Sequence, residues 1–131
     1  MPRFAILEHD WPTRHWDFLL EAGSALRAWR LLEEPELDKV VPAEANFDHR
    51  LLYLEFEGPL SGNRGSATRW DAGTFEWIEN ETNRAVVELM GARLMGEVKL
   101  EKHPEGWRFF YLRRGEKKLT PSRKDAEREL H

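Results

Sequence analysis

The sequence contains no cysteine among its 131 residues. Disulfide bonds and thiolate metal ligands are therefore excluded, and any bound metal must use histidine, aspartate or glutamate. No stretch approaches the roughly 20 apolar residues of a membrane-spanning helix, and the N-terminal segment MPRFAILEHDWP lacks the apolar core of a signal peptide. We therefore expect a soluble, cytoplasmic protein with no membrane association.

The chain also lacks an excess of positive charge, because 20 lysines and arginines stand against 24 aspartates and glutamates, a net charge of −4. The overall field does not favour non-specific binding of nucleic acid, so contact with DNA would need a local basic patch. The best candidate is the segment 113–128, in which basic residues outnumber acidic ones. A solvated terminal surface is the commoner role of such a mixed run, by roughly three to one.

The familiar sequence patterns of nucleotide-binding proteins and hydrolases are absent as well. The chain has no G-x-x-x-x-G-K-[ST], G-x-G-x-x-G, G-x-S-x-G or H-E-x-x-H. A cysteine nucleophile is excluded by composition. Any chemistry must therefore come from a less common grouping of polar residues.

Short apolar segments separated by Gly, Pro, Asn and Asp make up most of the chain, and they predict strands rather than helices. Helix remains an alternative for the segment 25–32. The six tryptophans are expected to be core anchors rather than a stacking platform, by roughly four to one. The predicted strands are 3–8, 15–22, 25–32, 51–57, 67–70, 74–78, 85–90, 93–100 and 107–113, with a hairpin turn at 71–73.

Two segments depart from this pattern. The irregular stretch 33–46 contains Pro35 and Pro42, which predicts a long loop over the mouth of the barrel. The segment 122–130 predicts a short helix with Ser122 as its N-cap. The number and spacing of the strands predict a single all-β domain over residues 1–131, a small β-barrel of about eight strands with one or two short helices.

Three polar residues near the N-terminus have a spacing that suits a metal site. His15 and Asp17 share one face if 15–22 is a strand, and His9 can return to the same place, at the barrel mouth, across a short loop. Two imidazoles and one carboxylate leave open positions on Mn²⁺, Zn²⁺ or Fe²⁺, where a phosphate oxygen or a water can bind. On spacing alone, ordinary polar residues are favoured over a metal site by roughly three to one.

A second group of interest is His49 with Tyr53. His49 follows Asp48 and is a candidate acid, base or phosphate contact, because histidine titrates nearest neutral pH. Tyr53 shares its face if the stretch is extended. The alternatives are an Asx turn before a strand and a buried structural tyrosine.

Four segments carry a family resemblance that covers most of the chain. Residues 3–21 are similar to a pattern E-H-x5-H-[YW]-D-[FL]-R-L-E, residues 48–58 to D-H-P-x2-Y-x2-F-E-G, residues 70–75 to W-D-x-G-x-[WF], and residues 89–107 to L-x-G-x-R-L-x-G with a following tryptophan. In this order they resemble the 3′-phosphoesterase domain of bacterial DNA ligase D, which also exists as a stand-alone protein.

The resemblance implies a small β-barrel with a divalent metal, most often manganese and alternatively zinc, held by His9, His15 and Asp17. It also implies that His49 and Tyr53 are catalytic and line the phosphate pocket. Enzymes of this family trim a 3′-terminal ribonucleoside and then the 3′-phosphate, so that a ligase or polymerase can use the 3′-hydroxyl. The partners to expect are DNA 3′ ends and a repair ligase or polymerase, with the protein itself a monomer.

The sequence departs from the family pattern at positions that bind phosphate. Leu19 and Val41 stand where the family has arginines, and Glu33 where it commonly has lysine. An aliphatic side chain cannot replace the planar guanidinium fork. The open alternatives are an inactive nucleic-acid or protein binding module, a hydrolase of smaller phosphoesters, or charge supplied from elsewhere, for which the candidates are Arg14, Arg27, Arg30, Arg64 and Arg69.

Overall fold

The computed structural model describes residues 1–113, which form strands and a single turn of 3-10 helix. The predicted helix at 122–130, and the basic run beyond Arg113, lie outside the described residues. No helix within residues 1–113 is long and apolar enough to cross a membrane. The elements are β1 (Arg3–His9), β2 (His15–Ala22), β3 (Ala25–Leu31), β4 (Val40–His49), η1 (Leu51–Leu54), β5 (Gly58–Pro59), β6 (Ser66–Glu81), β7 (Arg84–Gly91), β8 (Met95–His103) and β9 (Gly106–Arg113).

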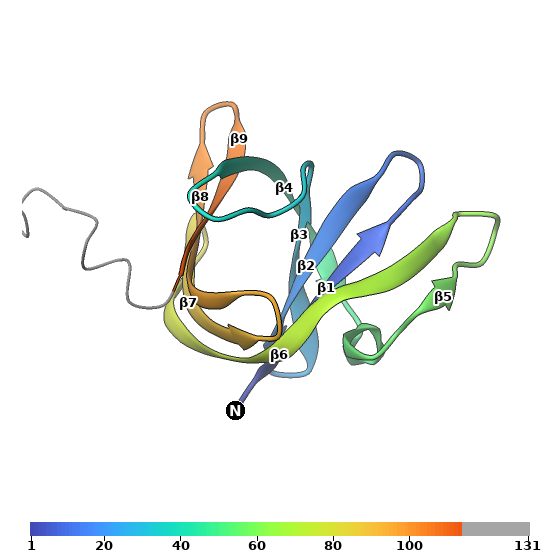
Figure 1. The fold of residues 1–131 in the computed structure, drawn as a ribbon, viewed down its shortest axis with the longest axis horizontal. Coiled ribbons are helices and arrows are strands. Elements are labelled where there is room, and N and C mark those ends of the chain that lie inside the picture. Colours follow the sequence, from blue (N-terminus) through green and yellow to red (C-terminus); the bar gives the residue numbers. More distant parts are fainter. Residues whose placement is uncertain (114–131) are drawn as a thin grey trace, which may run out of the picture.

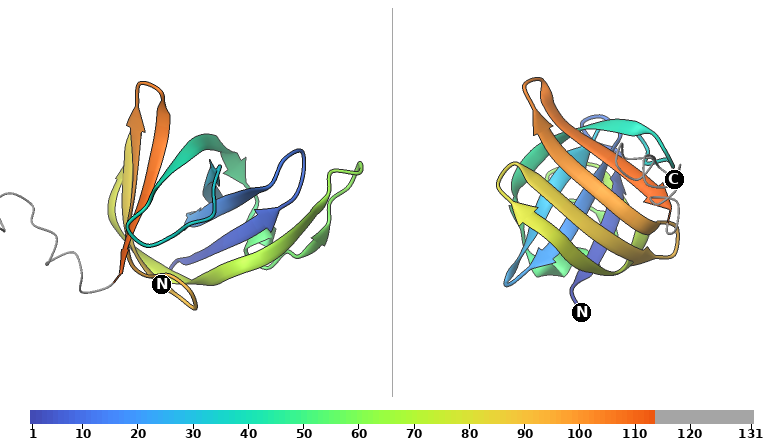
Figure 2. Two further views of the ribbon diagram at one scale, coloured as in Figure 1. Left: turned by 45° about the horizontal axis from the view of Figure 1, so that its top comes forward. Right: turned by 90° about the vertical axis from the view of Figure 1, so that its left-hand side faces the viewer.

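Eight of these strands close into a barrel (Figure 1). Their order is β1-β2-β3-β4-β9-β8-β7-β6, and pairing of β1 with β6 joins the two ends of the sheet. All these pairings are antiparallel, and the strands run diagonally around the barrel (Figure 2, right). The short β5 pairs with the start of β6 outside the ring. The predicted all-β barrel is confirmed.

One set of alternating side chains fills the barrel interior. Strand side chains point to opposite faces in turn, so β1, β2 and β3 each send every second residue inward. Three tryptophans, Trp16, Trp29 and Trp107, are buried there as predicted, whereas Trp11 is 43% exposed. The inward residues of β1 to β3 are Phe4, Ile6, Trp16, Phe18, Leu20, Trp29 and Leu31, and they pack against Val87, Leu89, Val98, Leu100 and Phe109 from the opposite wall.

The alternate residues of the same three strands form a smaller apolar cluster on the outside of the wall. Leu54 of η1 covers this cluster, and the coil of η1 lies outside the ring of strands (Figure 1). The wall formed by β1, β2 and β3 is therefore buried on both faces over much of its length. The cluster comprises Ala5, Leu7, Leu19, Leu26, Ala28, Leu54 and Ala67.

Two predicted elements near the middle of the chain are wrong. The expected loop 33–46 ends in β4, which pairs with both β3 and β9. Proline is tolerated there because Pro42 lacks only a donor, and its carbonyl accepts a hydrogen bond from Leu32 N–H at 2.9 Å. The expected strand 51–57 contains η1 instead, and its apolar content reflects packing of Leu54 on the outer wall.

The predicted hairpin turn at 71–73 is also wrong, because β6 runs through it without a break. The buried carboxylate of Asp71 accepts four backbone N–H bonds of 2.8–3.1 Å, one from Ala72 and three from residues 92–94. It thereby ties β6 to the turn between β7 and β8. Gly73 is required because a Cβ there would collide with the carbonyl of Met90.

Candidate metal centre

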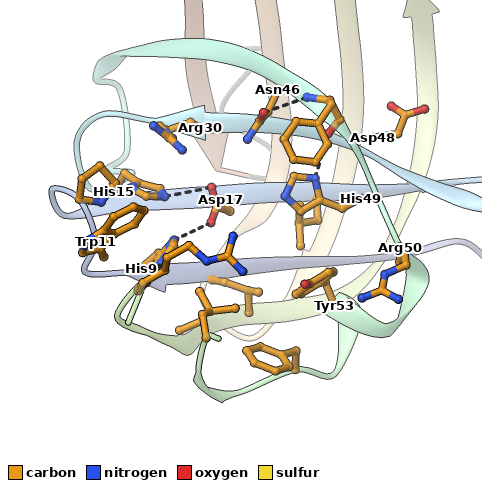
Figure 3. Close-up of a pocket in the computed structure, with 18 residues that line it drawn as sticks. His9, Trp11, His15, Asp17, Arg30, Asn46, Asp48, His49, Arg50 and Tyr53 are labelled. Carbon is orange, nitrogen blue, oxygen red and sulfur yellow. Dashed lines mark hydrogen bonds and ion pairs between the residues drawn. The ribbon is translucent and has the colours of Figure 1, made fainter. Parts of the chain in front are cut away.

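The three predicted ligands come together on the outer face of the wall (Figure 3). His9 ends β1 and lies directly opposite His15, which begins β2, and Asp17 is two residues farther along the same face. One ligand atom from each residue lies within 4.8 Å of the other two. His9 Nδ1 is 3.7 Å from Asp17 Oδ2, and His15 Nε2 is 3.3 Å from Asp17 Oδ1.

Backbone carbonyls orient both imidazoles. Nδ1–H of His15 donates to Thr13 O at 2.9 Å, and Nε2–H of His9 donates to Arg64 O at 2.8 Å. A carbonyl can only accept, so in the neutral rings the lone pairs lie on His15 Nε2 and His9 Nδ1, the two atoms closest to Asp17. Metal-binding histidines use this same arrangement, in which the second ring nitrogen is anchored by an outer partner.

The donor set fits a divalent metal ion. His15 Nε2 is buried and has no hydrogen-bond partner, and the imidazole–carboxylate approaches are ion-pair distances rather than hydrogen bonds. An unpaired buried polar atom costs about 1–3 kcal/mol, which a bound cation would offset. Two nitrogens and a carboxylate oxygen suit manganese, iron or zinc and leave coordination positions open.

The sequence suggested a site at the mouth of the barrel. The structure places the centre on the outer face of the wall instead. His9 and Asp17 follow the outward register of Leu7 and Leu19, whose neighbours Ile6 and Phe18 point into the core. The covering segment, residues 46–67 with η1 at its centre, closes over this part of the wall. The site is therefore a cleft between the wall and the covering segment.

This cleft is a cavity of about 350 Å³, and it brings the second predicted pair beside the first. His49 and Tyr53 both line it, with ring centroids 5.7 Å apart. Nδ1–H of His49 donates to Phe47 O at 2.9 Å, which leaves Nε2 of the neutral ring unprotonated. Tyr53 reaches the cleft from η1 and not from an extended strand, so the expected shared strand face is wrong although the two residues are neighbours.

Two aromatic residues at the cleft had no signal in the sequence. Phe47 is 75% exposed and stacks on His49, with ring centroids 5.0 Å apart and an interplanar angle of 18°. Trp11, also largely exposed, lines the cleft near His9. Both contribute apolar surface beside the polar side chains of the cleft.

The departures from the family pattern have different structural settings. Leu19 is fully buried and lines the cleft, whereas Val41 is fully buried in the barrel core. Glu33 forms a surface ion pair of 3.1 Å with Lys39. The absence of arginine at position 19 therefore changes the lining of the cleft directly.

Of the five arginines considered as substitutes, Arg30 and Arg64 line the cleft. The Arg64 guanidinium is exposed and donates to Ser61 O and Oγ. Arg30 had no distinguishing mark in the sequence, because its place beside Asp17 depends on the pairing of β2 with β3. The other three, Arg14, Arg27 and Arg69, lie outside the cleft, and Arg14 and Arg27 are bonded to Glu8 and Asn80.

The fold and site together define a small closed β-barrel with a candidate metal centre on its outer wall. Residues 7–102, which include all five candidate site residues, match the DNA Ligase D 3′-phosphoesterase domain family. The chain belongs to this family, and the resemblance noted in the sequence is confirmed.

Two relatives carry this domain within much longer chains. The chain is 33% identical to the multifunctional non-homologous end joining protein LigD of Pseudomonas aeruginosa over 104 residues, which are 72% of this chain and 12% of that protein. It is 30% identical to the multifunctional non-homologous end joining DNA repair protein LigD of Mycobacterium tuberculosis over 106 residues, 74% of this chain and 14% of that protein. The chain thus spans only a small part of these relatives' length.

Proposed function

We propose that the protein is a metal-dependent 3′-phosphoesterase that removes a 3′-phosphate or 3′-ribonucleotide from DNA ends. The proposal is carried by one observation: two carbonyl-anchored imidazoles present their free nitrogens to the Asp17 carboxylate, beside His49 and Tyr53 in the same cleft. Membership of the 3′-phosphoesterase family supports the same reaction.

His9, His15 and Asp17 would hold the ion, for which manganese is the first choice and zinc the alternative. When bound, a divalent ion polarises a phosphate oxygen and lowers the pKa of a coordinated water. The candidate ligands are oriented before the substrate arrives, because the backbone carbonyls of Thr13 and Arg64 hold both imidazoles. Little reorganisation is then needed on binding.

The covering segment supplies the groups for proton transfer and phosphate contact. His49 Nε2 is the ring atom left to exchange a proton, and protonated it can donate that proton to the departing 3′-oxygen. The Tyr53 hydroxyl is suited to donate a hydrogen bond to a phosphate oxygen. Cleavage of the phosphate–oxygen bond by water then leaves a 3′-hydroxyl and inorganic phosphate.

The product of this reaction is the end that a repair ligase or polymerase uses, and such an enzyme is the partner we propose. The names of the relatives connect this domain with non-homologous end joining. The cytoplasmic location expected from the sequence stays a proposal. We propose a monomer, because each of the eight barrel strands is paired on both sides and offers no open edge to a second copy.

The proposal is tested by incubating the protein and Mn²⁺ with primers that end in a 3′-phosphate or a 3′-ribonucleotide. We expect conversion to a 3′-hydroxyl that a polymerase can extend, and no action on a 5′-phosphate. His15→Ala should abolish turnover, whereas the matched control His103→Ala, which removes a histidine near Glu101 on β8, should retain it. Absence of turnover by the manganese-loaded wild type would contradict the proposal.

The buried Leu19 and Val41 favour one alternative, an inactive module that binds nucleic acid or protein on the same fold. Such a module would bind a partner equally well in the wild type and in His15→Ala, without turnover in either. Titration of a labelled primer in both proteins separates this alternative from the esterase.

A further inference from the structure

The cleft lacks the two arginines that the family pattern provides for binding phosphate. Leu19, at the position where the family pattern has arginine, is fully buried between the wall and η1. Val41, at the second such position, is enclosed in the barrel core and cannot reach the cleft. A phosphomonoester brings up to two negative charges next to Asp17, so a phosphoesterase needs a cation here beyond the metal.

Arg30 occupies the required place from the neighbouring strand. In the antiparallel register of β2 and β3 it lies directly opposite Asp17, while Ala28 lies opposite Leu19. Its side chain therefore stands on the outer face, lines the cleft and lies beside His15 and Asp17 (Figure 3). Arg30 thus lines the same cleft as the candidate metal ligands from β3, one strand away from Leu19.

The bonding of Arg30 is incomplete. Its Nε is buried without a hydrogen-bond partner, and the guanidinium forms no ion pair with any residue in the described part of the chain. Glu44, opposite Arg30 on β4, is exposed and does not pair with it. A partly buried cation without an anion is costly, which indicates that its counter-ion is a ligand.

The other two arginines of the cleft are placed differently. Arg64 already donates from Nε and Nη2 to Ser61. Arg50 is exposed at the start of η1. Arg30 alone among the described arginines of the cleft stands on the rigid wall, adjacent to a metal ligand and with a buried unpaired nitrogen.

We propose that Arg30 is the phosphate-binding arginine of this cleft. From the adjacent strand it makes the phosphate contact that Leu19 and Val41, which lack a guanidinium, cannot make. This inference rests on the proposed 3′-phosphoesterase function and deepens it. The fork of Arg30 binds two oxygens of the 3′-phosphate, and His9, His15 and Asp17 would hold the ion in the same cleft. The ligand class is a terminal phosphomonoester.

The test compares Arg30→Gln, Arg30→Lys and wild type on a 3′-phosphorylated primer with Mn²⁺. We expect Arg30→Gln to lower kcat/KM by about 100- to 1,000-fold, the scale of removing one transition-state donor, with Mn²⁺ affinity and melting temperature unchanged. Arg30→Lys keeps the charge without the fork and should recover part of the rate. The control Arg108→Ala, which removes an exposed arginine paired with Glu105, should behave as wild type.

A second measurement separates this inference from the proposed function. Metal-free wild type should bind a 3′-phosphorylated oligonucleotide about 10-fold more tightly than the same oligonucleotide with a 3′-hydroxyl, and Arg30→Gln should lose that preference. An active wild type with Arg30→Gln at an equal rate would overturn the role of Arg30 and leave the esterase proposal standing. An inactive wild type would overturn the esterase proposal, and the binding preference alone would then decide the role of Arg30.

Discussion

The inner and outer faces of the wall formed by β1, β2 and β3 carry different kinds of side chain on the same strands. Phe18 of β2 is fully buried in the core, and its ring meets that of Phe109 edge to face with centroids 5.6 Å apart. Its neighbour Asp17 points the other way and faces two imidazoles. Alternation thus assigns one set of residues to stability and the next to the candidate site.

This difference between the two faces explains how the candidate ligands are kept in register. A slip of one residue in the pairing of β1 with β2 would place His9 and Asp17 on opposite faces and would turn the core residues of one strand, such as Phe18, outward at a large cost in burial. The aromatic core on the inner face therefore fixes the register that aligns the ligands on the outer face. His49, at the end of β4, and Tyr53, in η1, line the cleft from other elements.

The sharpest test of this comparison is a substitution on each face of β2. Phe18→Ala should lower the free energy of unfolding by about 3–5 kcal/mol, because it leaves a large cavity in the core. Asp17→Ala should change it by less than about 1 kcal/mol in metal-free protein, because the side chain has few bonds to lose. Urea denaturation of both variants with EDTA measures this, and equal destabilisation would break the comparison.

His49 and Tyr53 should affect the rate without affecting the binding of the metal. His49→Gln removes the proton-exchanging nitrogen, and we expect kcat to fall by about 100-fold or more, or about 2.7 kcal/mol, with Mn²⁺ affinity unchanged. Tyr53→Phe should lower kcat by a smaller factor. Initial rates with calorimetric Mn²⁺ titration distinguish this from a loss of Mn²⁺ affinity, which would place His49 among the ligands.

A polar residue of the barrel framework should behave in the opposite way. Asp71→Asn keeps the shape of the side chain but weakens its bonds to the turn at 92–94, and we expect about 2 kcal/mol of lost stability. Activity per folded molecule and Mn²⁺ affinity should stay as in the wild type. A fall in either would show that Asp71 serves the cleft as well as the fold.

The smallest expected effect concerns the loop that supplies the carbonyl to His9. Asp10 Oδ1 accepts a hydrogen bond from Ser66 N–H at 2.8 Å and steadies the loop that carries Arg64 O. Asp10→Ala should weaken Mn²⁺ binding by about 10-fold, the low end of outer-partner effects. Glu105→Ala, on the distant β8–β9 turn, is the control, and identical Mn²⁺ affinities in the two variants would contradict this role.

The sequence was sufficient to predict the barrel and the grouping of His9, His15 and Asp17. Turn residues delimited most strands, and the β1–β2 hairpin that pairs His9 with His15 follows from two strands joined by a short loop. The side of the wall was not predictable, because Leu19 on the outer face is as apolar as Leu20 on the inner face. Leu19 is apolar because η1 packs against it, and this contact joins segments that are far apart in the sequence.

Other features depend on contacts between distant residues and so escaped prediction. Asp71 looks like a turn residue until its partners some twenty residues later are known. Arg30 resembles any strand arginine until the β2–β3 register sets it opposite Asp17. Pro42 suggests a loop, but a strand can keep a proline where only its carbonyl is needed.

Calorimetric titration of the purified protein with Mn²⁺ tests the central claim most directly, with Asp17→Ala and His103→Ala measured in parallel. We expect one ion per chain in the wild type and in His103→Ala, and a loss of binding well beyond 100-fold in Asp17→Ala, since a direct ligand should matter more than an outer partner. Failure of the wild type to bind, or undiminished binding by Asp17→Ala, would contradict the metal centre.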